Sequence, residues 1–145
     1  MKRIILGLLM IAGLSLAADA KDTYGHDASV LPKAAQSVIK KNFKTRVGVV
    51  KIDKDFGRIS EYEATLTDGS EITFDRDGNW KEIETNIEKS VPSAFVPTAI
   101  STFVKKNNPG TRIVGIEKKR NGYEISLSNG IDIEFDKQVN FLKYN

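Results

Sequence analysis

The feature of this sequence that most constrains its fold is a similarity between its two halves. Residues 62–84 (YEATLTDGSEITFDRDGNWKEIE) align with residues 123–145 (YEISLSNGIDIEFDKQVNFLKYN) at an offset of 61 positions, and 8 of the 23 pairs are identical. Upstream, LPKAAQSVIKKN (31–42) aligns with VPTAISTFVKKN (96–107) at an offset of 65. Self-similarity at such a period is typical of a repeated supersecondary unit. We therefore predict a tandem duplication in which both units have the same order of elements.

Each half begins with a segment that is typical of a helix. Pro32 and Pro97 suit the first helical turn, where a missing N–H leaves no hydrogen bond unmade. Apolar residues then recur at a spacing of three or four, which indicates one buried helix face. Two lysines close each segment, where positive charge is favourable for the helix dipole. Each half is therefore predicted to contribute one helix.

Four stretches of alternating apolar and polar residues follow each helix, as expected of antiparallel strands with one buried face. They span 47–52, 59–67, 70–75 and 80–84 in the first half, and 112–120, 123–128, 131–136 and 141–144 in the second. We predict an α+β fold of two tandem repeats, each one helix followed by a four-stranded antiparallel meander, with the helices on one sheet face.

The alternation also fixes the lengths of the hairpin loops. Because side chains alternate with a period of two, an odd loop is needed to bring the apolar sets of two neighbouring strands to the same face. Three-residue loops are therefore predicted at 67–69 and 128–130. At 121–122, in contrast, Asn-Gly fits a two-residue turn, which we predict to pair Ile116 with Leu127.

The first 20 residues are typical of a secretory signal peptide. A basic start (1–3) precedes an apolar run (4–16) too short to span a bilayer, and residues 18–20 (Ala-Asp-Ala) give a small-x-small cleavage site. A retained anchor is the alternative. After cleavage we expect no stable membrane insertion and a periplasmic or secreted protein. The predicted segments are a signal peptide (1–20), a loose lead (21–29), a first repeat (30–85), a connector (86–95) and a second repeat (96–145).

The composition argues against several classes of function. The chain has no Cys, which excludes zinc–thiolate sites and thiol catalysis, and its single histidine, His26, lies in the lead without a placed nucleophilic partner. Removing Lys2, Arg3 and Asp19 with the signal peptide leaves 20 basic and 18 acidic residues, a net charge of +2. This nearly neutral balance lacks the excess of basic residues that is typical of nucleic-acid-binding proteins. We expect no enzymatic activity, no cofactor and no nucleic-acid partner.

The stretch FDRDGNW (74–80) resembles a calcium loop, because it contains three oxygen-bearing side chains, Asp75, Asp77 and Asn79. Calcium takes six to eight oxygen ligands, however, and the spacing differs from that of an EF-hand loop. The second half has FDKQVNF (135–141) at the same place, which keeps the Phe, the first Asp, the Asn and an aromatic but not the second acid. We therefore predict a hairpin turn and no metal site.

The aromatic residues that end these two turns, Trp80 and Phe141, are candidate binding residues. A four-residue loop at 76–79 points Trp80 to the sheet face away from the helices, and the same register points Phe141 there. The alternative is an odd loop, which pairs Trp80 with Phe74 and buries it. Exposed aromatics anchor interfaces, and the side chains predicted around them form an acidic surface that favours a basic partner. The acidic candidates are Glu61, Glu63, Glu71, Glu124, Asp132 and Glu134.

The motifs LP..AQ..I, YE..L.DG.EI.FD..GNW and VP..FVP, partly repeated as VP..I...V and YE..L.NG..I.FD, resemble the PepSY-like family of small secreted proteins, whose fold is like that of the beta-lactamase inhibitory protein. The resemblance covers about residues 30–144, and residues 138–139 (Gln-Val) depart from it where the family has glycine. It implies two tandem helix-plus-sheet units with a concave sheet surface, export to the cell envelope, no catalysis, and a binding or inhibitory role.

The sequence therefore favours a non-catalytic exported binding module. In this hypothesis the protein docks onto another envelope protein, and in one version inhibits it, through the sheet face that the helices leave uncovered. The alternative is a periplasmic carrier of a small ligand or a metal ion, which would use the seam between the units or the acidic turns. The sequence does not name the partner.

Overall fold

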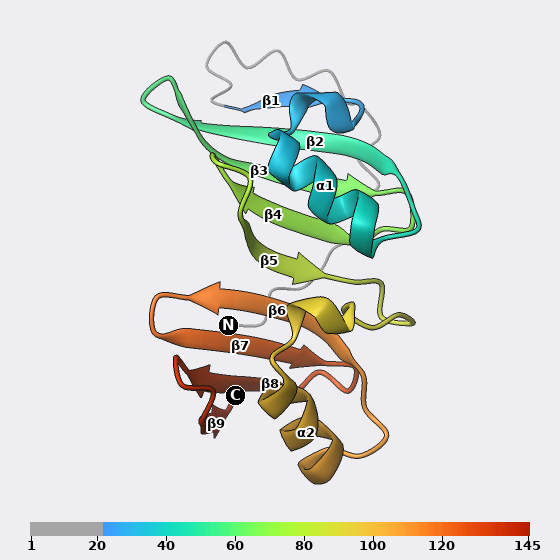
Figure 1. The fold of residues 1–145 in the computed structure, drawn as a ribbon, viewed down its shortest axis with the longest axis vertical. Helices are drawn as coiled ribbons and strands as arrows, with labels where there is room; N and C mark the ends of the chain where they lie inside the picture. Colours follow the sequence, from blue (N-terminus) through green and yellow to red (C-terminus); the bar gives the residue numbers. More distant parts are fainter. Residues whose placement is uncertain (1–21) are drawn as a thin grey trace.

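The computed structural model of this protein describes residues 22–145 (Figure 1). Nine strands form one antiparallel sheet, and their order in the sheet follows their order in the chain. Two α-helices, α1 (Lys33–Asn42) and α2 (Thr98–Asn107), lie on the same face of this sheet (Figure 1). The strands are β1 (Thr23–Gly25), β2 (Val47–Asp55), β3 (Arg58–Leu66), β4 (Glu71–Asp75), β5 (Trp80–Glu84), β6 (Ile113–Lys119), β7 (Gly122–Leu127), β8 (Asp132–Asp136) and β9 (Phe141–Tyr144).

This architecture shows that the predicted fold of two tandem repeats, each a helix plus a four-stranded meander, is wrong. β5 pairs directly with β6, and Ile83 lies opposite Ile116 at the centre of this pairing. The backbone hydrogen bonds therefore continue through the point where the two units were expected to separate. Joining β5 to β6 satisfies the N–H and C=O groups that two separate sheets would leave open at their edges. The result is a single nine-stranded sheet with a helix over each end of one face.

The segment 21–29, expected to be a loose lead, contains regular structure in its described residues. β1 pairs antiparallel with β2 and becomes one edge of the sheet. A short 3₁₀ helix, η1 (Ala28–Val30), follows, and the Asp27 carboxylate caps it by accepting a hydrogen bond from the Ser29 backbone N–H at 2.7 Å. His26, between these two elements, is exposed. The predicted signal peptide (1–20) lies outside the described residues.

Both helices occupy the segments that the sequence predicts, but each proline lies just before the first helical turn instead of within it. Pro32 and Pro97 occupy the position before the first helical residue. At the other end, the side chains of Asn42 and Asn107 each donate a hydrogen bond of 2.9 Å to the backbone carbonyl four residues earlier. Each helix buries one face on the sheet. The buried helix residues are Ala35, Ile39, Ile100 and Val104.

The three-residue loops at 67–69 and 128–130 are confirmed by the register of the strands that they join. Tyr62 lies opposite Phe74 across the first loop, and Tyr123 lies opposite Phe135 across the second. The two-residue turn between β6 and β7 is one position earlier than predicted, at 120–121. Consequently Ile116 pairs with Ile125, and the predicted pairing of Ile116 with Leu127 is wrong. The apolar rows still coincide, because Ile125 and Leu127 lie on the same face of β7.

A single hydrophobic core fills the space between the sheet and the helices. Side chains from both halves contribute to it, and Phe95 of the connector packs into it from a second 3₁₀ helix, η2 (Ser93–Phe95). The fully buried side chains on the helix-covered face of the sheet include Val50, Ala64, Ile72, Phe74, Ile83, Ile116, Ile125, Ile133 and Phe135. The alternate residues of the same strands therefore project from the opposite face, which no element of residues 22–145 covers in Figure 1.

Candidate functional site

Trp80 does not lie on the helix-free face, in contrast to the prediction. It pairs with Phe74, whose side chain is fully buried. The Trp80 ring meets the ring of Phe95 edge-on, with 5.5 Å between centroids. On its other side, the Lys118 ammonium lies 3.7 Å from the ring centroid, a cation–π contact. Trp80 is therefore a half-buried core residue at the seam between β5 and β6.

Phe141 also lies on the helix-covered side. It pairs with the buried Phe135 and stacks on Phe103 of α2 at 4.9 Å between ring centroids. Tyr144 packs against it at 5.0 Å, so the end of the sheet carries a cluster of four aromatic rings. Phe141 remains 39% exposed because β9 is an edge strand. The predicted pair of outward aromatics on the helix-free face does not exist.

A β-bulge explains why the predicted loop length was wrong. Ile72 lies opposite Ile83, whereas Phe74 lies opposite Trp80. The two pairings differ by one in register, so β5 accommodates one extra residue, Lys81. The loop between β4 and β5 is therefore three residues (76–78), and both Ile83 and Trp80 face the core. A bulge at the matching position of β9 has the same effect on Phe141.

The acid that opens each of these turns binds its own backbone. The Asp75 carboxylate accepts hydrogen bonds from the backbone N–H groups of Asp77 and Asn79, both at 2.9 Å, and from the Asn79 side chain at 3.1 Å. Burial raises the pKa of Asp75, but these hydrogen bonds outweigh it and hold the pKa below its usual value. Asp136 accepts the equivalent bonds from Asn140, at 2.8 and 3.1 Å. The FDRDGNW stretch is thus a self-capped turn.

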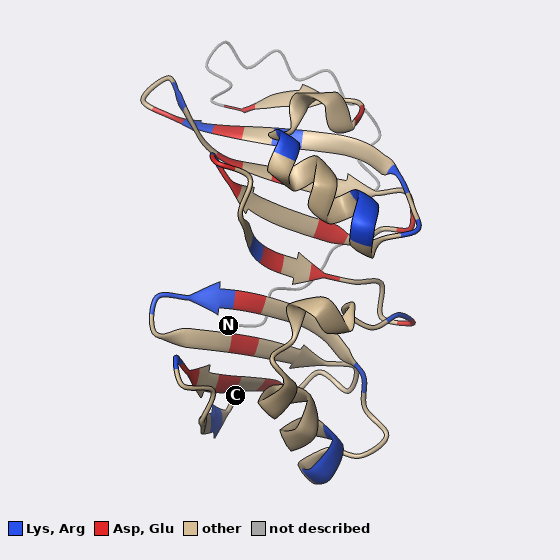
Figure 2. Ribbon diagram, in the orientation of Figure 1, with Lys and Arg blue, Asp and Glu red and all other residues tan. Residues whose placement is uncertain are grey.

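The helix-free face carries a row of glutamates that crosses four adjacent strands. Glu82 of β5 lies opposite Glu117 of β6, Glu117 lies opposite Glu124 of β7, and Glu124 lies opposite Glu134 of β8. We call these four residues the glutamate row. Figure 2 shows acidic positions in the middle of these neighbouring strands. Each of the four side chains is partly exposed, so the row presents carboxylates to solvent.

Other predicted acidic candidates extend this surface. Glu63 continues the row, because Thr73 of β4 lies opposite both Glu63 and Glu82. Glu71 and Asp132 lie in the adjacent set of cross-strand pairs, next to the row. Glu61 lies on the other side of the row, opposite Asp75, and pairs with Lys81 at 2.7 Å. Sequence reasoning missed Glu82, Glu84 and Glu117, which also lie on this surface. The signal was present, because each of the three adjoins a core isoleucine in its strand.

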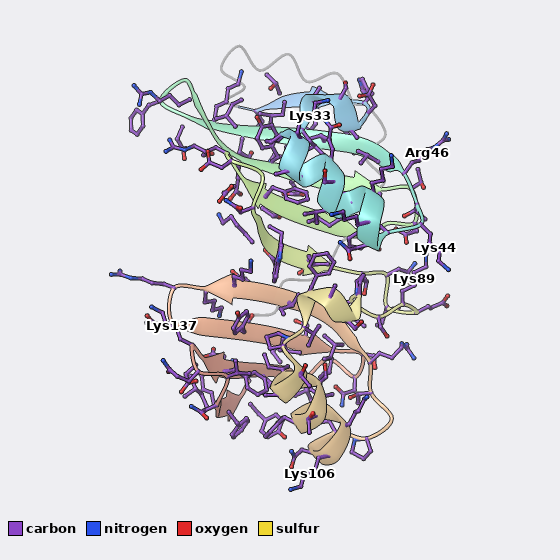
Figure 3. The ribbon with its side chains drawn as sticks, viewed as in Figure 1. Lys33, Lys44, Arg46, Lys89, Lys106 and Lys137 are labelled. Atoms are coloured by element: carbon purple, nitrogen blue, oxygen red, sulfur yellow. The ribbon has the colours of Figure 1, made fainter. Side chains whose placement is uncertain are left out.

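Lysines pair with acids at both ends of this surface and within the glutamate row. Lys51 pairs with Asp53 at 2.9 Å at one end, and Lys143 lies 3.7 Å from Glu134 at the other. Lys119 pairs with Glu124. Figure 3 labels six basic side chains that lie on the helices or around the rim of the molecule: Lys33, Lys44, Arg46, Lys89, Lys106 and Lys137.

Burial and the neighbouring carboxylates shift the pKa of one acid on this face, Glu71. Burial raises the pKa of Glu71 above its usual value, and the charges of Glu63 and Glu82 raise it further. In contrast, a hydrogen bond from Asn145, followed by the charges of Lys143 and Lys119, lowers the pKa of Glu134. The charged form is therefore disfavoured at Glu71 and favoured at Glu134.

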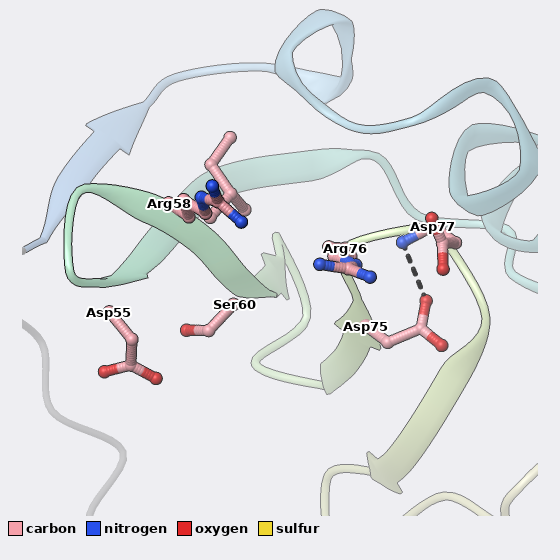
Figure 4. Close-up of a pocket in the computed structure, with 7 residues that line it drawn as sticks. Asp55, Arg58, Ser60, Asp75, Arg76 and Asp77 are labelled. Carbon is pink, nitrogen blue, oxygen red and sulfur yellow. Dashed lines mark hydrogen bonds between the residues drawn. The ribbon is translucent and has the colours of Figure 1, made fainter.

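A separate hollow of about 420 Å³ lies between the β2–β3 hairpin and the β4–β5 turn (Figure 4). Its lining mixes both signs of charge, with two arginines beside three aspartates. It is lined by Asp55, Arg58, Ile59, Ser60, Asp75, Arg76 and Asp77. Among residues 22–145, no group of three or more Asp, Glu or His side chains is arranged to hold a metal ion.

A family model described as "Putative beta-lactamase-inhibitor-like, PepSY-like" matches residues 60–143. This match covers more than half of the chain, and the protein therefore belongs to the PepSY-like family, as its motifs indicated. Among curated proteins, none matches the chain.

Solved structures agree with this assignment. A periplasmic protein of unknown function from Bacteroides vulgatus ATCC 8482 is 42% identical, with a TM-score of 0.80 over 86% of this chain and 98% of its own. A "putative calcium-regulated periplasmic protein" from Bacteroides thetaiotaomicron is 33% identical, with a TM-score of 0.78 over 86% of this chain and 96% of its own. A third, a periplasmic protein of the DUF2874 family from B. vulgatus, is also 33% identical, with a TM-score of 0.77 over 87% and 98%.

These relatives confirm the predicted periplasmic location, because all three are described as periplasmic proteins. None of the three is described as an enzyme. In the described part of the chain, no helix has the length and apolar character needed to cross a membrane.

Proposed function

We propose that this protein is a non-catalytic periplasmic binding module that docks a basic surface of another envelope protein onto its helix-free sheet face. The observation that carries the proposal is the glutamate row, in which carboxylates face one another directly across β5 to β8. The family description as beta-lactamase-inhibitor-like supports a role in binding protein. Glu61, Glu63, Glu71 and Asp132 extend the proposed surface, and Trp80 and Phe141 are no longer part of it.

Repulsion along the row is unfavourable for the isolated protein, although Lys119 and Lys143 offset part of it at Glu124 and Glu134, and this suggests a partner. Like charges directly opposite on antiparallel strands destabilise a sheet, by about 0.2–1 kcal/mol for each pair. Polar residues without charge would solvate this face equally well. Lysine or arginine side chains of a partner would remove the repulsion, so the free energy that the row costs in the free protein would favour the complex.

The chemistry of the face also defines how such a partner would bind. The row itself contains no large apolar side chain, so attraction between charges would supply most of the specificity and of the association rate. Such binding weakens as salt increases, because the Debye length falls from about 30 Å at 0.01 M to about 3 Å at 1 M. The proposed partner surface is therefore broad and basic, and it carries no large protruding apolar side chain.

The test compares two variants with the same change of formal charge. Glu117→Gln/Glu124→Gln neutralises the centre of the row, and Asp77→Asn/Glu88→Gln neutralises two exposed acids outside it. Each variant, checked for folding by circular dichroism, is used beside the wild type to retain proteins from a periplasmic extract, and the retained partner is then titrated in purified form. The proposal expects binding that is salt-dependent, weakened at least tenfold by the first variant and unchanged by the second. Equal binding by all three proteins would refute it.

Inhibition is a further version of the same proposal. Once a partner is purified, its activity is measured with and without this protein, and a beta-lactamase is included because of the family description. A partner that binds but keeps its full activity would show docking without inhibition.

One observation favours a second candidate, a calcium-responsive protein. The relative from B. thetaiotaomicron is described as calcium-regulated, and three aspartates line the hollow beside the β2–β3 hairpin. Against this, Arg58 and Arg76 line the same hollow, and hydrogen bonds within the turn already engage the Asp75 carboxylate. Calorimetry and thermal melting with calcium chloride distinguish the two candidates. Heat of binding with a raised melting temperature, both lost in Asp55→Asn, would favour the calcium candidate.

A further inference from the structure

The hairpin formed by β2 and β3 extends beyond the rest of the sheet. The last position at which β4 supports β3 is Glu61, and the last at which β1 supports β2 is Ile52. Among the described residues, the segment 54–60 therefore pairs only with itself, as a two-stranded arm. Figure 1 shows this arm projecting from one side of the molecule.

The tip of the arm places an aromatic residue in a backbone conformation that is unfavourable for it. Asp55 lies opposite Arg58, so the turn consists of Phe56 and Gly57 alone. Both have positive φ, 50° and 75°, as in a type I′ hairpin turn. Asn is favoured at the first position of this turn because it tolerates the left-handed region, whereas bulky side chains are disfavoured there. The choice of Phe therefore costs the hairpin stability.

Within residues 22–145, no burial of the Phe56 side chain compensates for this cost. Phe56 is 105% exposed, whereas the other exposed large apolar side chains are 37–62% exposed. At the adjacent Gly57, a Cβ atom would meet nothing within 4 Å, so the tip stands in open space. A residue held in a sparsely populated conformation without benefit to the fold indicates a functional constraint.

We propose that Phe56 is an apolar anchor that inserts into a hydrophobic pocket of a partner protein. Phe in a desolvated pocket is a strong interface contact, and a two-residue turn presents it in one fixed orientation. Lys54, Asp55 and Arg58, which flank it in the hairpin, carry both signs of charge. Binding to an anionic membrane surface would require a cluster of basic residues, which this arm lacks. The inference rests on the arm alone and is independent of the glutamate row.

The stability of Phe56→Asn tests whether Phe56 destabilises the free protein. Because Asn suits the first position of this turn, the melting temperature of the variant is expected to lie about 2–4 °C above that of the wild type. Phe56→Leu, which keeps an apolar but unsuitable side chain, is expected to melt within about 1 °C of the wild type. A lower melting temperature for Phe56→Asn would show that Phe56 supports the fold, and would overturn the proposal.

Photocrosslinking tests whether Phe56 inserts into a hydrophobic pocket of a partner protein. The full chain carrying p-benzoylphenylalanine at position 56 is irradiated in periplasmic extract, with unlabelled wild type, Phe56→Leu, Phe56→Asn or Glu117→Gln/Glu124→Gln as competitor. The proposal expects one protein adduct, mapped by mass spectrometry to apolar residues, that every competitor except Phe56→Asn suppresses. Equal suppression by Phe56→Asn, adducts only with lipid or with a second copy of this chain, or no adduct at all would overturn it. Failure of the double-glutamine competitor alone would instead assign the partner to the acidic face.

Discussion

Neutralising the centre of the glutamate row is expected to make the free protein more stable. Glu117 is the most informative position, because it lies directly opposite a carboxylate on each side, Glu82 on β5 and Glu124 on β7. Glu117→Gln keeps the size and hydrogen-bonding capacity of the side chain while removing its charge. Any change in stability should therefore be largely electrostatic.

The magnitude follows from the geometry of the sheet. Directly opposed residues have Cβ atoms about 5 Å apart, and carboxylates at their ends can separate to roughly 7 Å. At that distance two unit charges in water repel by about 0.6 kcal/mol, and Glu117 has two such neighbours. Lys119 offsets part of this through its ion pair with Glu124. We therefore expect Glu117→Gln to raise the free energy of unfolding by roughly 0.5–1 kcal/mol at low salt.

The assay is urea denaturation, because urea leaves the ionic strength unchanged. Unfolding is followed by the fluorescence of Trp80, the single tryptophan of the chain, at about 0.01 M and about 1 M sodium chloride. Screening at 1 M should remove the gain almost entirely. Glu88→Gln, an exposed acid of the connector outside the sheet, serves as the control and should change stability by less than about 0.3 kcal/mol at either salt concentration. A gain that persists at 1 M, or a loss at low salt, would refute the electrostatic argument.

Three further perturbations test other parts of the structure. Because the folded pKa of Glu71 is raised, the protein should lose stability as pH rises from about 4.5 through that folded pKa; Glu71→Gln should remove this slope in urea midpoints measured between about pH 4 and 7. Gly78 and Gly69 both have positive φ, 90° and 87°, but only at Gly78 would a Cβ contact a helix, at 3.1 Å from the Ala35 backbone nitrogen of α1. Gly69→Ala should therefore cost about 1–2 kcal/mol and Gly78→Ala clearly more, and equal losses would show that the turn does not pack on α1. Trp80→Ala should cost roughly 2–4 kcal/mol by circular dichroism, since the ring belongs to the core, and a loss below about 1 kcal/mol would contradict that placement.

The candidate surface was predictable from sequence in its outline but not in its aromatic part. Strict alternation along β3, β4, β7 and β8 was enough to assign Glu63 and Glu124 to the face opposite the core. Trp80 was misplaced because a β-bulge shifts the register inside β5, and a pattern with a period of two cannot show where an extra residue is inserted. Phe56 was missed for a different reason: a single aromatic between two charged residues has no periodicity, and its full exposure is a property of the folded hairpin.

The sequence by itself determined the local elements: the two helices with their prolines and asparagines, the strands with their alternation, and the odd loops at 67–69 and 128–130. These depend on interactions within a few residues, so their signals lie in short stretches of chain. Only the tertiary structure decided that β5 pairs with β6 in one continuous sheet, and that β1 joins its edge. Those pairings are made by backbone N–H and C=O groups. The side-chain patterns of the paired segments are compatible with one continuous sheet and with two separate sheets, so they could not decide between them. The length of the glutamate row is a consequence of that choice, because without the β5–β6 pairing Glu82 and Glu117 would not face each other.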